Sequence, residues 1–185
     1  MDRKIATSFS LYSIKQKNVA VLDPILVNQL CNGNLCYVSV PGVTSTGAEV
    51  EVSGQVTSSL GVRAGYSYNH KKADTNDQIG ILYAPHQASL WAIYNFAGQA
   101  GAGWWTGAGL QARSAVKGQG AFDVKNRGQA RIDLSGGYQA KLWSVVGGLK
   151  NVADKRLYTV GSGVFSSGEV SQTREFYLSG RYNFN

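Results

Sequence analysis

The chain has 185 residues, enough for one domain with a core or for one small β-barrel. Charged residues make up 16% of the chain, below the roughly 25% of a typical soluble protein, and no run of about 18 apolar residues predicts a transmembrane helix. The net charge of +7 suits nucleic acid, anionic lipid or an anionic ligand equally well, so composition alone excludes none of them.

Eight segments alternate apolar and polar residues with the period of two that is typical of a β-strand. In chain order the predicted strands are 3–16, 45–56, 60–68, 86–96, 103–113, 129–140, 142–151 and 174–185. No segment predicts a helix. We therefore expect an all-β chain of about eight antiparallel strands, the smallest number of strands in a closed membrane barrel.

The last strand shows the pattern most clearly. One face carries Phe176, Leu178, Gly180, Tyr182 and Phe184, with aromatic residues toward both ends, and the other face is polar. When every strand's apolar face is set in this way, eight charged residues fall on the opposite face: Glu49, Glu51, Arg63, Arg113, Arg131, Asp133, Lys150 and Arg181. Because a cation on a lipid-facing surface costs about 2–4 kcal/mol at mid-depth, this sorting favours a membrane barrel with its apolar face toward lipid.

The connections between the strands alternate between long and short. The long ones are about 17–43, 70–83, 117–127 and 152–172, and the short ones lie near 57–59, 97–102 and 141. Outer-membrane barrels have long extracellular loops and short periplasmic turns. A soluble antiparallel barrel, with its apolar side chains inside, is the alternative, but the apolar faces here are rich in Ala, Gly and Val rather than in large residues.

Two cysteines, Cys31 and Cys36, lie close together in a segment rich in Gly and Asn. Two thiols do not make a closed zinc site, so we expect a small disulfide loop and an oxidising compartment; two free thiols are the alternative. No signal peptide is apparent after Met1, which suggests a mature chain or a piece of a longer one.

Several segments, in order, resemble the C-terminal part of the β-barrel of TonB-dependent outer-membrane siderophore receptors. They are S-L-Y-S-I-K-Q-K-N-V-A (10–20), G-V-T-S-T-G-A-E-V-E-V (42–52), G-Y-S-Y-N (65–69), A-P-H-Q-A-S-L-W-A-I-Y (84–94), L-K-N-V-A-D-K-R-L-Y (149–158) and R-Y-N-F (181–184). The chain departs from the family pattern at Thr44–Thr46, which replace a basic residue, and at Asn185, which follows the usual terminal Phe.

The resemblance implies that residues 1–185 are a C-terminal portion of a barrel of about twenty-two strands, located in the outer membrane of a Gram-negative cell. The family's N-terminal plug domain and its TonB-contacting box are not recognised in this chain. The implied function is transport of a ferric siderophore, for which this portion alone is not expected to be competent. The alternative is a self-contained eight-stranded barrel, open or closed, with a structural or adhesive role. In a closed barrel, residues 5–11 would pair with residues 176–184.

The resemblance also implies partners and sites. The expected partners are outer-membrane lipid and lipopolysaccharide, a ferric siderophore as transported ligand, the barrel-assembly machinery, and TonB only through the missing plug region; nucleic acid is not expected. Basic residues gather near the predicted extracellular ends, where a cationic rim would attract anions. The candidate ligand-binding residues are Tyr37, Lys155, Arg156, Tyr158 and Phe165, and the candidate barrel-assembly signal is Phe176, Leu178, Tyr182 and Phe184.

No catalytic constellation is apparent in the sequence. The two histidines, His70 and His86, are interpreted as structural residues at strand ends. The G-A-G-L-Q-A stretch at 107–112 matches a nucleotide-binding pattern, but it lies in a predicted strand with no helix behind it. We therefore expect neither an enzyme nor a bound cofactor or metal.

Overall fold

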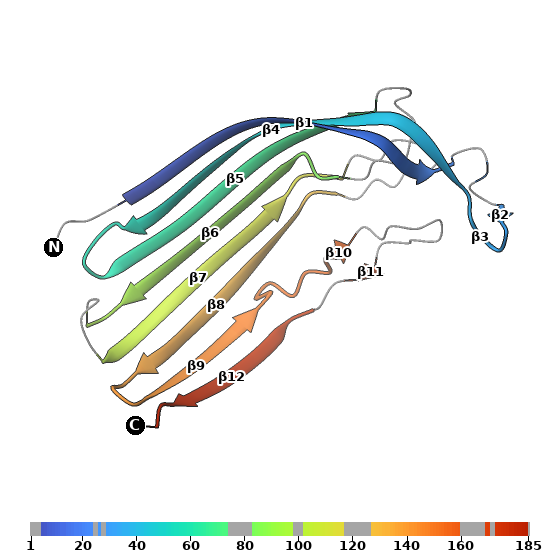
Figure 1. Cartoon of the computed structure of the whole chain (residues 1–185). Helices are drawn as coiled ribbons and strands as arrows, with labels where there is room; N and C mark the ends of the chain where they lie inside the picture. The colour runs from blue at the N-terminus through green and yellow to red at the C-terminus, as the bar shows by residue number, and fades with distance from the viewer. Residues whose placement is uncertain are drawn as a thin grey trace.

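The structure, a computed structural model, describes residues 5–23, 26, 29–73, 83–97, 102–116, 127–159, 169–170 and 173–184. Within these ranges eight strands form one sheet (Figure 1). They are β1 (Ile5–Leu22), β4 (Tyr37–Gln55), β5 (Leu60–Ala73), β6 (His86–Asn95), β7 (Gly103–Arg113), β8 (Gln129–Gln139), β9 (Trp143–Lys150) and β12 (Glu175–Tyr182). Two short pairs complete the strands: β2 (Leu30–Cys31) with β3 (Asn34–Leu35), and β10 (Tyr158–Thr159) with β11 (Glu169–Val170).

Every neighbour in the large sheet is antiparallel, and its order is β1-β4-β5-β6-β7-β8-β9-β12. The strands thus pair in the order in which they follow one another along the chain, with β1 and β12 at the two edges, an arrangement that short turns and local loops allow. The prediction of an all-β antiparallel fold with eight main strands is confirmed. Among the described residues no helix is long and apolar enough to cross a membrane.

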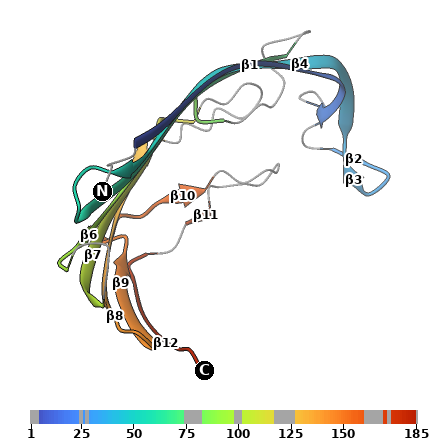
Figure 2. The same cartoon turned by 60° about the vertical axis from the view of Figure 1, so that its left-hand side comes forward.

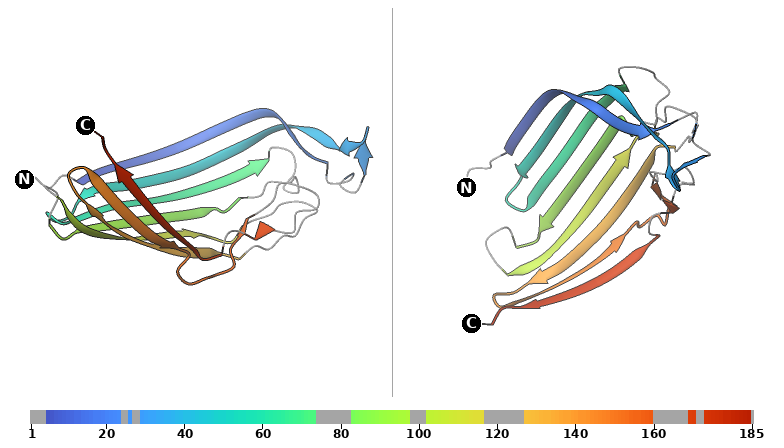
Figure 3. Two further views of the ribbon diagram at one scale, coloured as in Figure 1. Left: turned by 90° about the horizontal axis from the view of Figure 1, so that it is seen from below. Right: turned by 45° about the vertical axis from the view of Figure 1, so that its right-hand side comes forward.

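The sheet is curved, and its polar face lies on the concave side. Figures 2 and 3 show the eight strands as an open trough, with β10 and β11 on its inner side. The side chains of Arg113 and Gln129, from the polar faces of β7 and β8, reach the main chain of Tyr158 in β10. The polar residues therefore point into the trough, toward what would be the lumen of a barrel.

The apolar face is convex, and its side chains are exposed or half-buried. Leu134, in the middle of β8, is 45% exposed, and Leu178 of β12 is 69% exposed. Among the described residues the buried apolar side chains are Cys36, Val43 and Val116, which do not amount to a dry core. A soluble barrel would have buried the apolar face, so the lipid-facing orientation is the one that this fold supports.

The long connection predicted at 17–43 is wrong at both of its ends. β1 continues to Leu22 and β4 begins at Tyr37, so this pair extends well past the other strands. The interruption is small: the pairing omits Asn18, which has a φ of 55°, and the facing Pro41. Proline cannot donate to the ladder, and Asn tolerates a positive φ, so the two residues form a local irregularity rather than an end.

Two other connections also contain more structure than predicted. β5 continues to Ala73 instead of ending near Tyr68, and the 152–172 segment includes β10 and β11. The last strand ends at Tyr182, three residues before the predicted limit, and the other predicted strand limits agree within two residues. The first and last strands, β1 and β12, lie at opposite edges of the sheet and do not pair with each other. The closed eight-stranded alternative therefore does not match the structure.

We predict that the two faces of the sheet respond oppositely to a cation. Leu134→Arg places a charge at the middle of the lipid-facing side of β8 and is expected to lower the free energy of unfolding from lipid vesicles by about 2–4 kcal/mol. Ser89→Arg places the same side chain on the polar face of β6 and is the matched control. Urea titration followed by heat-modifiable migration measures both; equal losses would contradict the assigned orientation.

Candidate functional site

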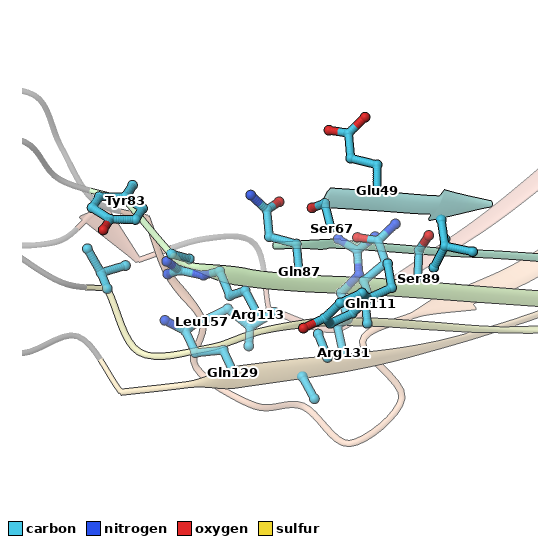
Figure 4. Close-up of a pocket in the computed structure, with 18 of the residues that line it drawn as sticks. Glu49, Ser67, Tyr83, Gln87, Ser89, Gln111, Arg113, Gln129, Arg131 and Leu157 are labelled. Atoms are coloured by element: carbon cyan, nitrogen blue, oxygen red, sulfur yellow. The ribbon is translucent and has the colours of Figure 1, made fainter. Parts of the chain in front are cut away.

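A hollow lies on the concave face, at the end of the sheet where the long connections are. Its volume is about 760 Å³. Its floor is built by polar side chains from five adjacent strands, and Tyr83 and Leu157 stand at its loop end (Figure 4). Tyr158, the residue after Leu157, also lines the cavity. The polar floor residues are Glu49, Glu51, Ser67, Gln87, Ser89, Gln111, Arg113, Gln129 and Arg131. The cavity is thus rich in hydrogen-bond donors and acceptors.

One ion pair on the concave face has geometry that the sequence pattern did not predict. The guanidinium of Arg131 contacts Asp133 through its Nη2 atom at 2.9 Å and donates from Nε at 3.1 Å. Because the two residues are two apart on one strand, both side chains point into the trough. Asp133 is only 13% exposed, so this two-point contact is shielded from solvent on one side.

The segment after β9 is anchored to the floor of the cavity through Tyr158. The carbonyl of Tyr158 accepts a hydrogen bond from Gln129 Nε2 at 3.1 Å and another from Arg113 Nη2. The amide of Tyr158 donates to Gln129 Oε1 at 2.7 Å. Gln129 therefore uses both ends of its side-chain amide to hold one residue, and the segment closes the cavity from the side of β9.

The start of the same segment depends on Asn151, which is 1% exposed. Its side chain donates from Nδ2 to the carbonyl of Lys155 at 2.8 Å and accepts from the Lys155 amide at 3.1 Å. Its own amide donates to Asp133 Oδ1 at 2.8 Å. Asp133 thus joins Arg131 of the cavity to Asn151 of the loop, and both main-chain groups of Lys155 are satisfied within a five-residue turn.

The side chain of Trp91 lies on the concave face beside the cavity, nearer the short turns. The indole of Trp91 lies across β7, and a Cβ atom added at Gly109 would overlap its ring. A Cβ atom added at Gly107 would lie 3.5 Å from the same ring. This explains the glycines of the G-A-G-L-Q-A stretch without a nucleotide: they make room for Trp91 on the concave face.

The predicted ligand-binding residues do not form one group. Tyr158 lines the cavity and is 38% exposed, whereas Lys155 and Arg156 are exposed in the preceding turn and do not line it. Tyr37 is exposed at the start of β4 and does not line the cavity, which β4 reaches only with Glu49, Val50 and Glu51. Phe165 lies outside the described residues. The described residues contain no cluster of three or more His, Cys, Asp or Glu that could hold a metal ion.

The predicted cysteine pair and the predicted barrel-assembly signal lie near opposite edges of the sheet. Cys31 and Cys36 are joined by a disulfide at the β2–β3 hairpin, with their Cα atoms 5.1 Å apart. Phe176, Leu178 and Tyr182 of β12 and the following Phe184 all lie on the convex side and are between 54% and 89% exposed. Tyr182 and Phe184 contact each other edge to face, at 4.9 Å between ring centroids.

Sequence reasoning missed the residues that hold the cavity together: Gln129, Asp133 and Asn151. Their pattern gave a partial signal, because Asp133 and Arg131 share the polar face of one strand and Asn151 opens the N-V-A-D-K stretch. What the pattern could not supply was the fold-back that brings Tyr158 to Gln129, since contacts between residues 29 positions apart depend on tertiary structure.

Most of the chain matches one known protein family. Residues 1–152 match the family described as TonB dependent receptor-like, beta-barrel. The chain belongs to this family. Its members are outer-membrane proteins, so the resemblance drawn from the sequence motifs and the location in the outer membrane are both confirmed.

Individual relatives are receptors. The chain is 29% identical over 201 residues to the ferric-pyoverdine M114 receptor of Pseudomonas sp. (strain M114), covering 99% of this chain and 23% of that receptor. It is 38% identical over 112 residues to the ferrioxamine receptor of Yersinia enterocolitica, covering 56% of this chain and 14% of that receptor. The chain therefore spans about a quarter or less of the length of these relatives.

A solved structure supports the fold. The ferric preacinetobactin receptor of Acinetobacter baumannii superposes with a TM-score of 0.76 at 18% identity, over 97% of this chain and 27% of that one. At this identity the likeness concerns the fold alone. It matches the eight-stranded curved sheet to part of a larger barrel.

We predict that Asn151→Gly frees the turn at 151–155. The substitution keeps the positive φ of 51° accessible but removes both side-chain hydrogen bonds to Lys155, which should cost about 1–3 kcal/mol of local stability. Amide hydrogen exchange at 152–158 should accelerate accordingly. Asn32→Gly, at a φ of 53° in the distant β2–β3 hairpin, is the control, and unchanged exchange in Asn151→Gly would refute the anchoring role.

Proposed function

We propose that residues 1–185 are a C-terminal portion of the barrel of an outer-membrane receptor that transports ferric siderophores. The single observation that carries this proposal is the polar cavity on the concave face, walled by a loop that is anchored to its floor. A receptor needs a polar ligand chamber open to the outside, and this one lies at the end of the sheet that bears the long connections. The relatives named above are receptors for ferric-pyoverdine and ferrioxamine, which supports this ligand class.

The charges in the cavity suit a chelate that carries anionic, cationic and hydrogen-bonding groups. Arg113 and Arg131 supply positive charge, and Glu49 and Glu51 supply negative charge. The glutamines supply amides, and Tyr158 supplies a ring at the loop end. Lys155 and Arg156, exposed in the adjacent turn, are proposed to attract the ligand rather than to hold it. Tyr37 and Phe165 remain candidates for contacts at an earlier stage of entry.

A complete transporter requires more than this sheet. Within the described ranges, the edge strands β1 and β12 each have a neighbouring strand on one side only, and a bilayer does not tolerate an open sheet edge. We propose that further barrel strands cover them, that a plug region couples the receptor to TonB, and that the aromatic residues of β12 guide barrel assembly. A receptor role without enzymatic activity accounts for the cavity; a self-contained structural or adhesive barrel does not explain the open edges.

We predict that this chain can replace the matching stretch of the ferric-pyoverdine M114 receptor. The chimera should insert in the outer membrane and bind ferric pyoverdine, because the matching stretch covers 99% of this chain. Changing Arg113 and Arg131 to Gln in the chimera should weaken binding at least tenfold, since each hydrogen bond to a charged group contributes about 1.5–3 kcal/mol.

Equilibrium binding of iron-55-labelled ferric pyoverdine to cells measures the affinity, and surface labelling of the chimera verifies its insertion. Lys141→Gln, at the short-turn end of the sheet, is the control variant and should bind as the parent chimera does. A chimera that inserts normally and binds no ferric pyoverdine, ferrioxamine or other ferric siderophore would contradict the proposal.

A further inference from the structure

A second hollow lies on the opposite, convex face, toward the short turns. It is a groove of about 670 Å³ over β7, β8 and β9. Its floor consists of Gly136 and Gly147, which face each other directly across the β8–β9 ladder. Neither glycine has a side chain, so the lipid-facing surface is hollow at this point. On the next strand, Leu178 of β12 lies directly opposite Gly147.

Aromatic rings form the wall of this groove on the side of the short turns. Trp104 contacts Tyr138 at 5.1 Å between ring centroids, and Tyr138 contacts Trp143 at 5.4 Å. Each ring comes from a different strand, at the end of that strand nearest the turn. Trp and Tyr mark the level of the lipid headgroups in membrane proteins, so the groove begins just inside that level and continues into the hydrocarbon region.

The groove is complete without any further strand. β7, β8 and β9 each have neighbours on both sides in the described sheet, so strands added beyond β1 or β12 would not cover it. It lies on the face that the family's location assigns to lipid. A hollow in that face has to be filled by hydrocarbon, since water there would lose its hydrogen bonds.

The charge at the turn end of the groove is positive. Lys141 is exposed in the tight turn between β8 and β9, where the Ala140 amide donates to the carbonyl of Trp143 at 2.8 Å. No Asp or Glu occurs in the parts of the chain that line or flank the groove, which are residues 95–109, 136–147 and 176–185. An anionic headgroup at this level would therefore meet a cation and no opposing acid.

We propose that this groove binds one anionic phospholipid of the periplasmic leaflet, with an acyl chain over Gly136 and Gly147 and the phosphate group near Lys141. The aromatic rings pack against the chain where it leaves the headgroup region, and the glycines let it approach the main chain closely. The inference depends on the lipid-facing orientation of the convex face and is independent of which ferric ligand the receptor transports.

The test uses the protein, within its complete receptor polypeptide or the chimera described above, reconstituted in phosphatidylethanolamine vesicles. Increasing fractions of phosphatidylglycerol brominated on its acyl chains are added, and quenching of tryptophan fluorescence reports lipid contact. Trp104 and Trp143 line the groove, whereas Trp91 lies over Gly109 on the concave face. Brominated phosphatidylethanolamine at the same mole fractions measures contact without the headgroup preference.

We expect phosphatidylglycerol to be preferred, and Lys141→Gln to lower that preference about fivefold while non-selective quenching persists. Gly147→Leu should abolish the preference by filling the groove; a Cβ there meets Leu178 at an ordinary 3.7 Å, so the strand should tolerate it. Ala108→Leu, on the same face of β7 but outside the groove, is the control. Heat-modifiable migration checks that each variant is folded.

Equal quenching by the two lipids in the unsubstituted protein would overturn the proposal, as would a preference that survives Gly147→Leu. Weak quenching by both lipids would instead refute the lipid-facing orientation itself. Loss of ferric-ligand binding in a variant that keeps its lipid preference would concern the proposed receptor function and not this groove.

Discussion

The constraint on which this structure depends is that main-chain hydrogen-bonding groups cannot be left unpaired in hydrocarbon. The antiparallel ladders satisfy it from β1 to β12, and the alternation of side chains along each strand then separates two environments. Apolar side chains such as Leu134 and Leu178 face outward, while Arg131 and Asp133 face the trough. The cavity and the convex groove are both consequences of this one sheet, each on the face whose chemistry it needs.

The two hollows are made in different ways. The cavity exists because a loop returns to the sheet and is fastened there by Gln129 and Asn151, so its shape is set by specific hydrogen bonds. The groove exists because two facing residues have no side chain, so its shape is set by the main chain. Long-range contacts therefore matter for the first and local sequence matters for the second.

Much of the fold was predictable from the period of two. The limits of β6, β7, β8 and β9 agree closely with the predicted strands, because alternation is strong and the polar breaks between them are clear. The outer part of the β1–β4 pair was missed, since Pro41 resembles a loop signal even though the ladder continues past it to the pair Leu22–Tyr37, which directly follows Cys36 in the chain. The cavity was not predicted, and Tyr158 alone among the candidate ligand-binding residues lines it, because residues such as Gln129 have no distinctive pattern until the loop folds back onto them.

The unequal length of the strands has a consequence for how the protein meets its surroundings. β1 and β4 have 18 and 19 residues, and β9 and β12 have 8 each. A bilayer is crossed by about 9–11 tilted residues, so the remainder of the first pair stands above the surface as a ribbon that curves over the mouth of the trough (Figure 2). The disulfide between Cys31 and Cys36 closes the tip of this arm, so the part of the described chain that extends furthest beyond the other strands is also covalently cross-linked.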